Sequence, residues 1–470
     1  MIDCALISIP PLFFNGPHIG PALLKSYAQT KGYTVTCFNP SLDMAEILTE
    51  DHKKQWPYND FKDFDETYDL DAIISTWADY WLSFNPKLIG LSTHVWASEF
   101  FLERICKVLR QKTDTTIIVG GPATIELSDR ALSNGWVDYH VVGDGEEAFL
   151  NALEGKFDHP SMNTNKPHAV SNATFAELPP PDYSDIDFEQ YRALDAKQNR
   201  VFVIGTRGCV FDCSFCNVPA LMKYRFKDGI KFAQEVKDIQ KQHNPEWIEF
   251  ADSLINGSLR EYRKMITKLS ELNTAEPDTK PKIVAFYRIR PFTQTREEDF
   301  KLMAEAGFYR LKIGVESGSQ DVRNHIGKTE TEEEILYTFE MCKKYGLHIN
   351  LLIIVGYPTE TKADFEKTMD MLRMIKDLGY AGTVDRAVVN ELYFSQDTGL
   401  SKQIEVLEIQ NAESNTNWTR ILPNGELLDA AERQRRLDES IGYIKENFSG
   451  KIMVFSESKT TMEDNKNDKV

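Results

Sequence analysis

The chain has 470 residues, of which 41% are hydrophobic and 11% aromatic, so it can build two or more hydrophobic cores rather than one. Its formal net charge of −18, from 54 basic and 72 acidic residues, opposes the phosphate neutralisation that nucleic-acid binding needs. The longest apolar runs, such as INLLIIVG, are too short to cross a bilayer, and the first residues lack the pattern of a secretory signal, so we expect a cytoplasmic protein with neither membrane nor nucleic acid as partner.

The first 155 residues alternate short β-rich runs with helical patterns. The runs are CALISIP, YTVTCFN, LIGLSTHV, TTIIVGG and DYHVVGDG. This alternation is typical of a parallel sheet with crossover helices, so we predict a doubly wound, Rossmann-like α/β domain over residues 1–155. Three consecutive prolines follow Leu178 and favour an extended chain, so residues 156–195 are predicted to be a linker.

A second series of β-rich runs, again separated by helical patterns, follows the linker. The runs are VFVIGT, WIEFAD, KIVAFYRI, RLKIGVES, INLLIIVG and AVVNELYF. Because these units are fewer than the eight of a closed barrel, we predict an open, partial (β/α)6 barrel over residues 196–400. Apolar residues at helical spacing then predict a helical extension over 401–455, and the tail 456–470, with almost no apolar residues, is predicted to be disordered.

Three of the seven cysteines, Cys209, Cys213 and Cys216, are crowded into the stretch GTRGCVFDCSFCNVP. This stretch directly follows the first predicted barrel strand, at the end of the strand where barrel enzymes carry their chemistry. Three soft thiolate ligands suit an iron–sulfur cluster. A structural zinc ion would need a fourth ligand, and no cysteine or histidine lies nearby in the sequence to complete the set. Three unrelated buried thiols are the remaining alternative.

The stretch RGCVFDCSFCNVP resembles the signature of the radical S-adenosylmethionine (SAM) superfamily, and its place after the first strand of a six-unit barrel agrees with that family. The resemblance implies that Cys209, Cys213 and Cys216 hold three irons of a [4Fe–4S] cluster. The fourth iron would then be open to the amino and carboxylate groups of S-adenosylmethionine, which one electron cleaves to a 5′-deoxyadenosyl radical. A low-potential electron donor such as flavodoxin or ferredoxin is implied as well.

Three further segments, FADSLING, MAEAGFYRLKIGVESGSQDVRNHIGK and LLIIVGYPTET, resemble the family's segments at barrel strands two, four and five. For each residue there, ordinary turn chemistry is the alternative, and the aspartate after strand two is also suited to cap a helix. Arg288 and Arg290 are predicted either to reach an anionic substrate or the cofactor carboxylate, or to lie on the surface. The residues that the resemblance implies as S-adenosylmethionine contacts are Phe215, Asp252, Glu316, Ser317, Gly356, Tyr357 and Pro358.

Pieces of the first domain resemble the cobalamin-binding domain that precedes the barrel in cobalamin-dependent radical SAM enzymes. They are ISIPPLFFNGPHIGPALLKSYAQTKGYTV, LIGLSTHVW, IIVGGPATIEL and VDYHVVGDGEEAF, and the resemblance covers roughly residues 1–400. It implies a cobalamin at the carboxyl edge of the sheet, where glycines let the backbone approach a large flat ring. The implied contacts are Ser92, Thr93, Gly120, Gly121, Gly143, Gly145 and Glu146.

Two details of this domain depart from that resemblance. The motif D-x-H-x-x-G, which supplies a histidine to the cobalt in some cobalamin domains, is not matched by NGPHIG, because Gly16 replaces the aspartate and the spacing to the next glycine is one residue short. His18 is therefore not assigned as a cobalt ligand. The turn GDGEEA also fits a dinucleotide fingerprint, an alternative that its acidic residues weaken because they would face a pyrophosphate.

These features predict a cobalamin-dependent radical SAM methyltransferase that acts on an unactivated carbon of a small molecule or peptide-like precursor. The alternative is a radical SAM enzyme that does not methylate but rearranges, oxidises or contracts its substrate, with or without bound cobalamin. A methylthiotransferase would carry three further clustered cysteines in its first domain, where only the well-separated Cys4, Cys37 and Cys106 occur. A cobalamin sensor without activity leaves the crowded cysteines unexplained. No catalytic residue is assigned from the sequence.

Overall fold

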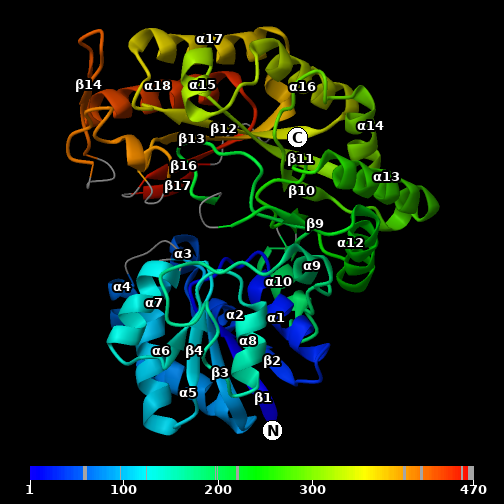
Figure 1. Cartoon of the computed structure of the whole chain (residues 1–470), viewed down its shortest axis with the longest axis vertical. Coiled ribbons are helices and arrows are strands. Elements are labelled where there is room, and N and C mark those ends of the chain that lie inside the picture. Colours follow the sequence, from blue (N-terminus) through cyan, green and yellow to red (C-terminus); the bar gives the residue numbers. More distant parts are fainter. Residues whose placement is uncertain are drawn as a thin grey trace. The chain divides into compact units, whose positions relative to one another are not determined.

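A computed structural model gives the structure of the chain, and it describes residues 1–56, 61–95, 97–122, 124–195, 197, 199–218, 222–394, 398–412, 417–456 and 459–463 (Figure 1). The chain forms two compact units, Met1–Ile204 with Ile239–Ala251 and Gly205–Asp238 with Asp252–Val470. The domain boundaries that the sequence suggests at residues 155, 195 and 400 stay predictions. No helix in the described ranges is long and apolar enough to cross a membrane.

The first unit is built on a five-stranded sheet in which every neighbouring pair of strands is parallel. The order β2-β1-β3-β4-β5 is the flavodoxin-like order of a doubly wound fold, in which the chain changes direction between β1 and β3. The predicted Rossmann-like fold is thereby confirmed, with each of its strands. Their bounds are β1 Ile2–Ser8, β2 Val35–Phe38, β3 Pro86–Ser92, β4 Ile117–Gly120 and β5 Tyr139–His140.

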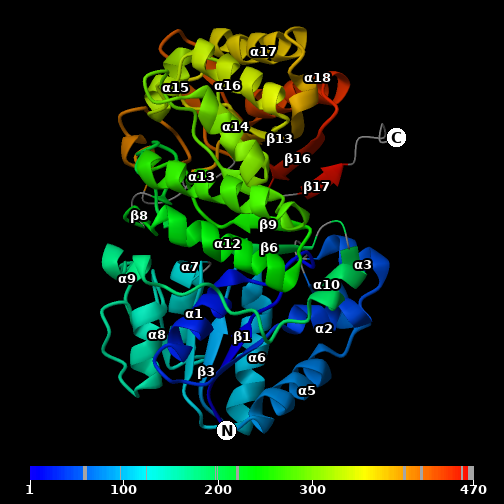
Figure 2. The same cartoon turned by 90° about the vertical axis from the view of Figure 1, so that its right-hand side faces the viewer.

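Helices cover both faces of this sheet, because successive side chains of a strand point to opposite faces and both sets are apolar. On β1, Ala5 and Ile7 belong to a core with side chains of α5 (Leu70–Ser83) and α6 (Ser98–Lys112). Cys4 and Leu6 belong to the opposite core, with side chains of α1 (Ile19–Gln29) and α8 (Glu146–Leu153). The sheet thus lies between α1 and α8 on one face and α5 and α6 on the other (Figure 2), and the carboxyl ends of its parallel strands form one edge.

The second sheet has eight strands in the order β17-β16-β13-β12-β11-β10-β9-β6. Strands β6 and β9 to β13 are the six that the sequence predicts, and they appear in chain order, as in a barrel that stays open. The partial barrel is thereby confirmed. The strand bounds are β6 Arg200–Val203, β9 Trp247–Phe250, β10 Ile283–Phe286, β11 Phe308–Glu316, β12 His348–Val355 and β13 Val384–Glu391.

Helices connect consecutive strands of the barrel, as the sequence pattern predicts. Capping boxes begin α16 and α17, where Thr331 and Thr361 each pair with the acidic residue three positions later. The helix bounds are α12 Gly229–His243, α13 Leu259–Ala275, α14 Glu297–Ala306, α15 Gln320–Ile326, α16 Glu332–Tyr345 and α17 Lys362–Asp377.

The C-terminal part contains more strands than the sequence suggests. The predicted helix is present as α18 (Ala430–Asn447), but it is preceded by the hairpin of β14 (Arg420–Ile421) and β15 (Leu427–Leu428). It is followed by β16 (Lys451–Ser456), which pairs with β13, and by β17 (Lys459–Glu463), which pairs with β16 (Figure 1). The prediction of a disordered tail from residue 456 is therefore wrong for 459–463, because backbone pairing at a sheet edge does not require apolar side chains.

Candidate functional site

The loop that carries the three cysteines begins in the second unit just after β6 and makes a short strand, β7 (Thr206–Arg207), that pairs with β8 (Arg225–Phe226). Gly208 turns the chain into Cys209 with a positive φ of 76°. A Cβ there would lie 2.6 Å from the Lys223 carbonyl oxygen, so the turn needs glycine. The stretch 209–216 is thus held close to the carboxyl ends of the barrel strands.

The three thiols lie within one another's electrostatic influence. Burial raises the pKa of the Cys216 thiol, and the neighbouring Cys213 and Cys209 raise it further. Three thiols held together in one loop offer the soft ligands that an iron–sulfur cluster takes.

Cationic side chains surround Cys213. Burial raises the pKa of its thiol, while Lys328 and Arg288 lower it, so both cations favour the thiolate that iron requires. Arg288, only 9% exposed, donates from Nη1 to Cys213 Sγ at 3.2 Å and from Nε to Glu330 at 2.7 Å. Its guanidinium also lies 3.9 Å from the centre of the Phe211 ring. The expectation that Arg288 lies on the surface is wrong.

Arg290 is held in the same region. Its guanidinium lies 4.7 Å from the centre of the Phe211 ring and donates to the carbonyl oxygens of Asn256 and Gly257, the latter at 3.1 Å. Phe211, in the cysteine loop, is thus in contact with two arginines from the end of β10. The two arginines therefore hold the loop in place. The sequence alone does not reveal these contacts.

Glu316 is the last residue of β11, and its φ of +67° lies in the left-handed region. This backbone conformation is unusual for a residue other than glycine or asparagine. Its carboxylate lies 3.1 Å from Lys328 Nζ, and both residues are buried. Both charges of this ion pair act on the pKa of the Cys213 thiol, which shows that the pair lies near that cysteine. A strained, charged residue beside a predicted cofactor site is typical of functional positions. Lys328 is a site residue that sequence reasoning missed.

Tyr357, predicted to contact adenine, lies fully buried beneath the cysteine loop. Its hydroxyl lies 2.8 Å from Ser214 Oγ and 2.9 Å from His325 Nδ1. The Ser214 amide also donates to the Ile326 carbonyl at 2.8 Å, and the Ser214 carbonyl accepts from the Leu400 amide at 2.6 Å. Tyr357 therefore fixes the loop from below. Phe215, in the same loop, packs half-buried against the apolar cluster around Cys213.

The remaining predicted contacts after β11 and β12 have clear roles in the fold. Ser317 is buried, and its hydroxyl lies 3.2 Å from Thr368 Oγ1 and accepts from the Ser319 amide at 3.1 Å. Gly356 has φ +69°, and a Cβ there would lie 2.5 Å from Arg433 Cγ. The Pro358 carbonyl accepts from Arg420 at 2.5 Å. Their contact with S-adenosylmethionine stays a prediction.

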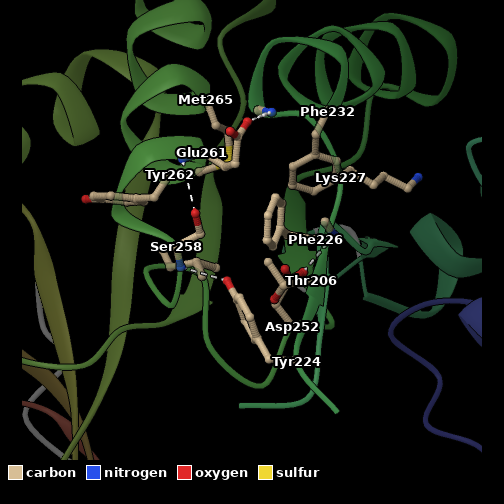
Figure 3. A pocket seen from close by; sticks show the side chains of 13 residues that line it. Thr206, Tyr224, Phe226, Lys227, Phe232, Asp252, Ser258, Glu261, Tyr262 and Met265 are labelled. Atoms are coloured by element: carbon tan, nitrogen blue, oxygen red, sulfur yellow. Dashed lines mark hydrogen bonds between the residues drawn. The ribbon is translucent and has the colours of Figure 1, made fainter. Parts of the chain in front are cut away.

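Asp252 lines a pocket between α12, α13 and the β7–β8 hairpin, shown in Figure 3. It is 2% exposed and accepts from the Gly205 amide at 3.1 Å, while its Oδ1 has no hydrogen-bond partner among the described residues. Burial raises the pKa of its carboxyl to about 6. The alternative of a helix cap is wrong, because Ser258 caps α13 by accepting from the Glu261 amide. The aromatic side chains of Tyr224, Phe226, Phe232 and Tyr262 also line this pocket.

In the first unit, the residues predicted to bind cobalamin follow three adjacent strands at one sheet edge. Ser92 and Thr93 end β3, and both the amide and the hydroxyl of Thr93 donate to the Gly120 carbonyl at the end of β4, at 2.8 and 3.2 Å. Gly143, Gly145 and the buried Glu146 follow β5. These residues lie at the carboxyl edge of the sheet, which includes the switch point between β1 and β3, and open α/β folds bind their ligands at this edge.

The glycines at this edge differ in what they permit. Gly121, at φ +118°, has the Thr93 carbonyl oxygen 2.0 Å from the position of a Cβ, and Gly143, at φ +94°, has the His168 carbonyl oxygen at 2.2 Å. The fold itself therefore requires glycine at both positions. At Gly120 the nearest atoms to a Cβ lie 3.7 Å away, on Val141, which is ordinary contact. Gly120 alone of the three leaves room for a methyl group.

His18, which the sequence left unassigned, lies at the same edge. It immediately precedes α1, its Nδ1 lies 3.4 Å from Ser92 Oγ, and its ring meets that of His94 edge-on at 4.3 Å. Burial lowers the pKa of His18 well below its usual range, and His94 lowers it further, so the imidazole is neutral. In the D-x-H-x-x-G motif an aspartate would orient the histidine. His18 instead contacts Ser92 and His94.

Comparisons with known proteins agree with this geometry. Residues 203–372 match the radical SAM superfamily, so this part of the chain is a radical SAM domain. The chain is 24% identical over 318 residues to an uncharacterized methyltransferase of Pyrococcus horikoshii, covering 63% of this chain and 66% of that protein. It thus spans just under two thirds of the length of that relative.

Solved structures share the fold over nearly the whole chain. TsrM of Kitasatospora setae, a radical S-adenosylmethionine methyltransferase solved with tryptophan substrate and a SAM analogue, superposes with a TM-score of 0.69 at 14% identity, covering 99% of this chain and 93% of that one. OxsB, a cobalamin-dependent SAM radical enzyme solved with aqua-cobalamin, gives 0.66 at 16% identity, covering 91% and 63%. The combination of a doubly wound sheet and an open barrel is therefore the fold of these enzymes.

Proposed function

We propose that this chain, with its radical SAM domain at residues 203–372, is a cobalamin-dependent methyltransferase that acts on an unactivated carbon of a small molecule or peptide-like precursor. One observation carries the proposal: Cys209, Cys213 and Cys216 share one loop and one electrostatic environment. Three thiolates held together in one loop suit an iron–sulfur cluster. The likeness of the fold to TsrM and OxsB supports the cobalamin part.

The second unit would hold the [4Fe–4S] cluster and S-adenosylmethionine. The three cysteines would bind three irons, and Arg288 would stabilise negative charge on Cys213 through its hydrogen bond to the sulfur. Glu316 and Lys328, paired beside Cys213, are the charged groups best suited to meet the polar end of S-adenosylmethionine. When bound, the cluster and S-adenosylmethionine supply a 5′-deoxyadenosyl radical and the corrinoid supplies a methyl group, with electrons from a low-potential donor such as flavodoxin or ferredoxin.

Apolar side chains around the loop support its role as a radical site. Phe211 and Phe215 are half-buried, and they pack on a fully buried cluster that includes Leu392, Phe394 and Leu400. These residues would keep water away from the reacting groups and hold the loop in one conformation. What the chain itself contributes is thus alignment and exclusion of water.

The first unit would hold the corrinoid at its switch-point edge. The exposed backbone of Gly121 and Gly143 gives a flat ligand an approach that no side chain obstructs, and Ser92, Thr93 and Gly120 lie beside it. Internal packing requires Gly121 and Gly143 as well, so these glycines are also compatible with a domain that binds no corrinoid. This compatibility supports the second candidate function, a radical SAM enzyme that does not methylate its substrate.

A methylthiotransferase is disfavoured by the positions of the remaining cysteines in the first unit. Cys4 and Cys37 belong to the core on one face of its sheet, and Cys106 belongs to the core on the other face. All three are fully or almost fully buried, and burial raises the pKa of each thiol. Three thiols separated by a sheet cannot bind a second cluster together.

Reconstitution of the full chain under anaerobic conditions tests the radical chemistry. With iron and sulfide supplied, we expect about four irons per chain and reductive cleavage of S-adenosylmethionine to 5′-deoxyadenosine, measured by chromatography. Cys213→Ala should abolish the cleavage, whereas Cys342→Ala, a buried cysteine of α16, should retain it. Continued formation of 5′-deoxyadenosine by Cys213→Ala would exclude the assigned cluster.

A further inference from the structure

Two histidines and a glutamate that have no role in the proposed function gather in the first unit. Glu147 lies in the first turn of α8, His159 follows that helix, and His168 pairs with Gly143 in an isolated parallel bridge. The segment between the two histidines folds back over the turn after β5. Its backbone is fixed there, because the His168 amide donates to the Val142 carbonyl at 3.1 Å and its carbonyl accepts from the Asp144 amide at 2.8 Å.

The ligand atoms of these side chains all lie within 4.8 Å of one another. His159 Nε2 lies 3.9 Å from Glu147 Oε2, and the rings of His159 and His168 meet edge-on at 5.0 Å. Ligands of a zinc ion lie about 2.0–2.2 Å from the metal, so two of them are about 3.4 Å apart in a tetrahedral site. The carboxylate and the His159 imidazole, at 3.9 Å, are close to that separation, and small side-chain rotations would bring all three ligands to one ion.

Two of the three ligands have an outer partner of the kind that orients metal-binding side chains. His159 Nδ1 lies 2.7 Å from the hydroxyl of the fully buried Ser161, which leaves Nε2 facing Glu147. Thr174 donates to Glu147 Oε1 at 3.1 Å, which leaves Oε2 for a cation. The Ser161 amide donates to His159 Nδ1 at 3.2 Å in this structure. Metal binding through Nε2 requires the tautomer that carries its proton on Nδ1, which then donates a hydrogen bond to the Ser161 hydroxyl in place of the bond from the amide.

We propose that Glu147, His159 and His168 bind one divalent transition-metal ion of the zinc class, with water in the remaining position. Two imidazoles and a carboxylate form a donor set that zinc takes in proteins, and the half-exposed site leaves room for water. The ion clamps the segment 156–170 onto the turn after β5. It does so at Gly143, Gly145 and Glu146, so it stabilises the edge to which the corrinoid is assigned, although the metal site itself does not rest on that assignment.

Metal uptake by the full chain tests the site. Because free thiols of the cluster loop also take up zinc, the chain carries Cys209→Ala, Cys213→Ala and Cys216→Ala, and the probes are Zn²⁺, counted by elemental analysis after dialysis, and Co²⁺, followed by its visible spectrum. We expect one zinc per chain and a Co²⁺ spectrum without thiolate charge-transfer bands. Glu147→Gln, His159→Gln and His168→Gln should each weaken zinc binding at least about tenfold, and the matched control His52→Gln should not.

Thermal melting keeps the test independent of folding defects. Zinc should raise the Tm of the chain with an intact site, and this increase should vanish in Glu147→Gln, whose substitution at a half-exposed position leaves the Tm in chelator unchanged. Zinc content that is the same in the Glu147, His159 and His168 variants as in the parent chain would overturn the proposal. So would a parent chain that holds no zinc after dialysis at micromolar free metal.

Discussion

At the scale of single residues, the contact between Arg288 and Cys213 matters most, because it joins a fixed positive charge to a sulfur that is predicted to bind iron. Reduction adds negative charge to a cluster, and a charge-assisted hydrogen bond to its ligand sulfur stabilises that charge. Arg288 also neutralises the buried Glu330, so its loss leaves a second negative charge uncompensated nearby. Both effects act on the potential in the same direction.

We therefore expect Arg288→Gln to lower the midpoint potential of the cluster by several tens of millivolts, and Arg288→Lys to lie between it and the wild type, since lysine keeps the charge but not the planar fork. The measurement is a redox titration followed by electron paramagnetic resonance. Arg290→Lys, which keeps a charge beside Phe211, is the control. Identical potentials in the wild type and both Arg288 variants would show that the arginine only packs.

A second residue-scale prediction concerns the pH dependence of stability. Burial raises the pKa of Asp252 from 3.8 to about 6, so the folded protein favours the neutral acid. The stabilising contribution is present below the unfolded pKa and is lost as pH rises through about 6. Relative to the wild type, Asp252→Asn should gain up to about 3 kcal/mol of stability between pH 4 and pH 7.

Urea unfolding at several pH values, followed on the full chain, measures this gain. Asp299→Asn is a suitable control, because Asp299 is buried but paired with Arg263 at 2.8 Å. A stability difference between Asp252→Asn and the wild type that does not change with pH would contradict the assigned ionisation.

At the scale of elements, the cysteine loop depends on the end of β12 for its support. Tyr357→Phe removes the hydroxyl between the buried Ser214 and the half-buried His325 and leaves both without this partner, which should cost about 1–2 kcal/mol of unfolding free energy. Faster loss of iron to a chelator should accompany the change. Because the two partners share one interaction, Ser214→Ala and Tyr357→Phe should not be additive.

The KM for S-adenosylmethionine separates the two roles of this tyrosine. A supporting role predicts a KM close to that of the wild type together with less stable iron, and Tyr380→Phe, at a half-buried position in the same unit, should change neither quantity. A large rise in KM with unchanged iron retention would contradict the supporting role and indicate that Tyr357 contacts the adenine of S-adenosylmethionine.

The edge of the first sheet gives a second prediction at this scale. Gly120→Ala should weaken corrinoid binding and leave the Tm unchanged, because its Cβ meets nothing closer than 3.7 Å. Gly121→Ala should lower stability by at least about 1–3 kcal/mol, because its Cβ would collide with the Thr93 backbone. Bound cobalamin and Tm, measured on both variants, distinguish the two effects. A Gly120→Ala protein with full corrinoid content would contradict the assignment of that edge.

Local patterns account for most of the elements. Most strands that the sequence predicts in the two sheets are rich in apolar and β-branched residues, and such runs can be recognised without knowledge of the neighbouring strands. Strands β16 and β17 were missed because their pairing with β13 depends on the path of the whole chain. The burial of Arg433 and Arg436 on α18 likewise depends on partners outside the helix, Trp418 and Glu360.

For the candidate site too, local features could be predicted from the sequence and long-range contacts could not. Cys209, Cys213 and Cys216 lie within one loop, so their spacing is visible in the sequence. The approach of Arg288 and Lys328 to Cys213 joins segments at least 75 residues apart, so no local pattern encodes it. The roles of Ser317 and Tyr357 in the fold likewise depend on Thr368, Ser214 and His325, which only the folded chain brings to them.

At the scale of the whole molecule, the two units carry separate parts of the proposed chemistry. The thiols, Arg288 and the Glu316–Lys328 pair belong to the second unit, and the residues assigned to the corrinoid belong to the first. Because each compact unit has its own core, a change in one set of side chains should leave ligand binding by the other intact.

Bound corrinoid and 5′-deoxyadenosine, quantified in the same anaerobically reconstituted sample, test the combination of cofactors directly. The wild type should show corrinoid absorption corresponding to one molecule per chain and should cleave S-adenosylmethionine. Cys213→Ala should keep the corrinoid and form no 5′-deoxyadenosine. A wild-type protein that cleaves S-adenosylmethionine but binds no corrinoid would contradict the cobalamin-dependent reaction and leave a radical SAM enzyme without it.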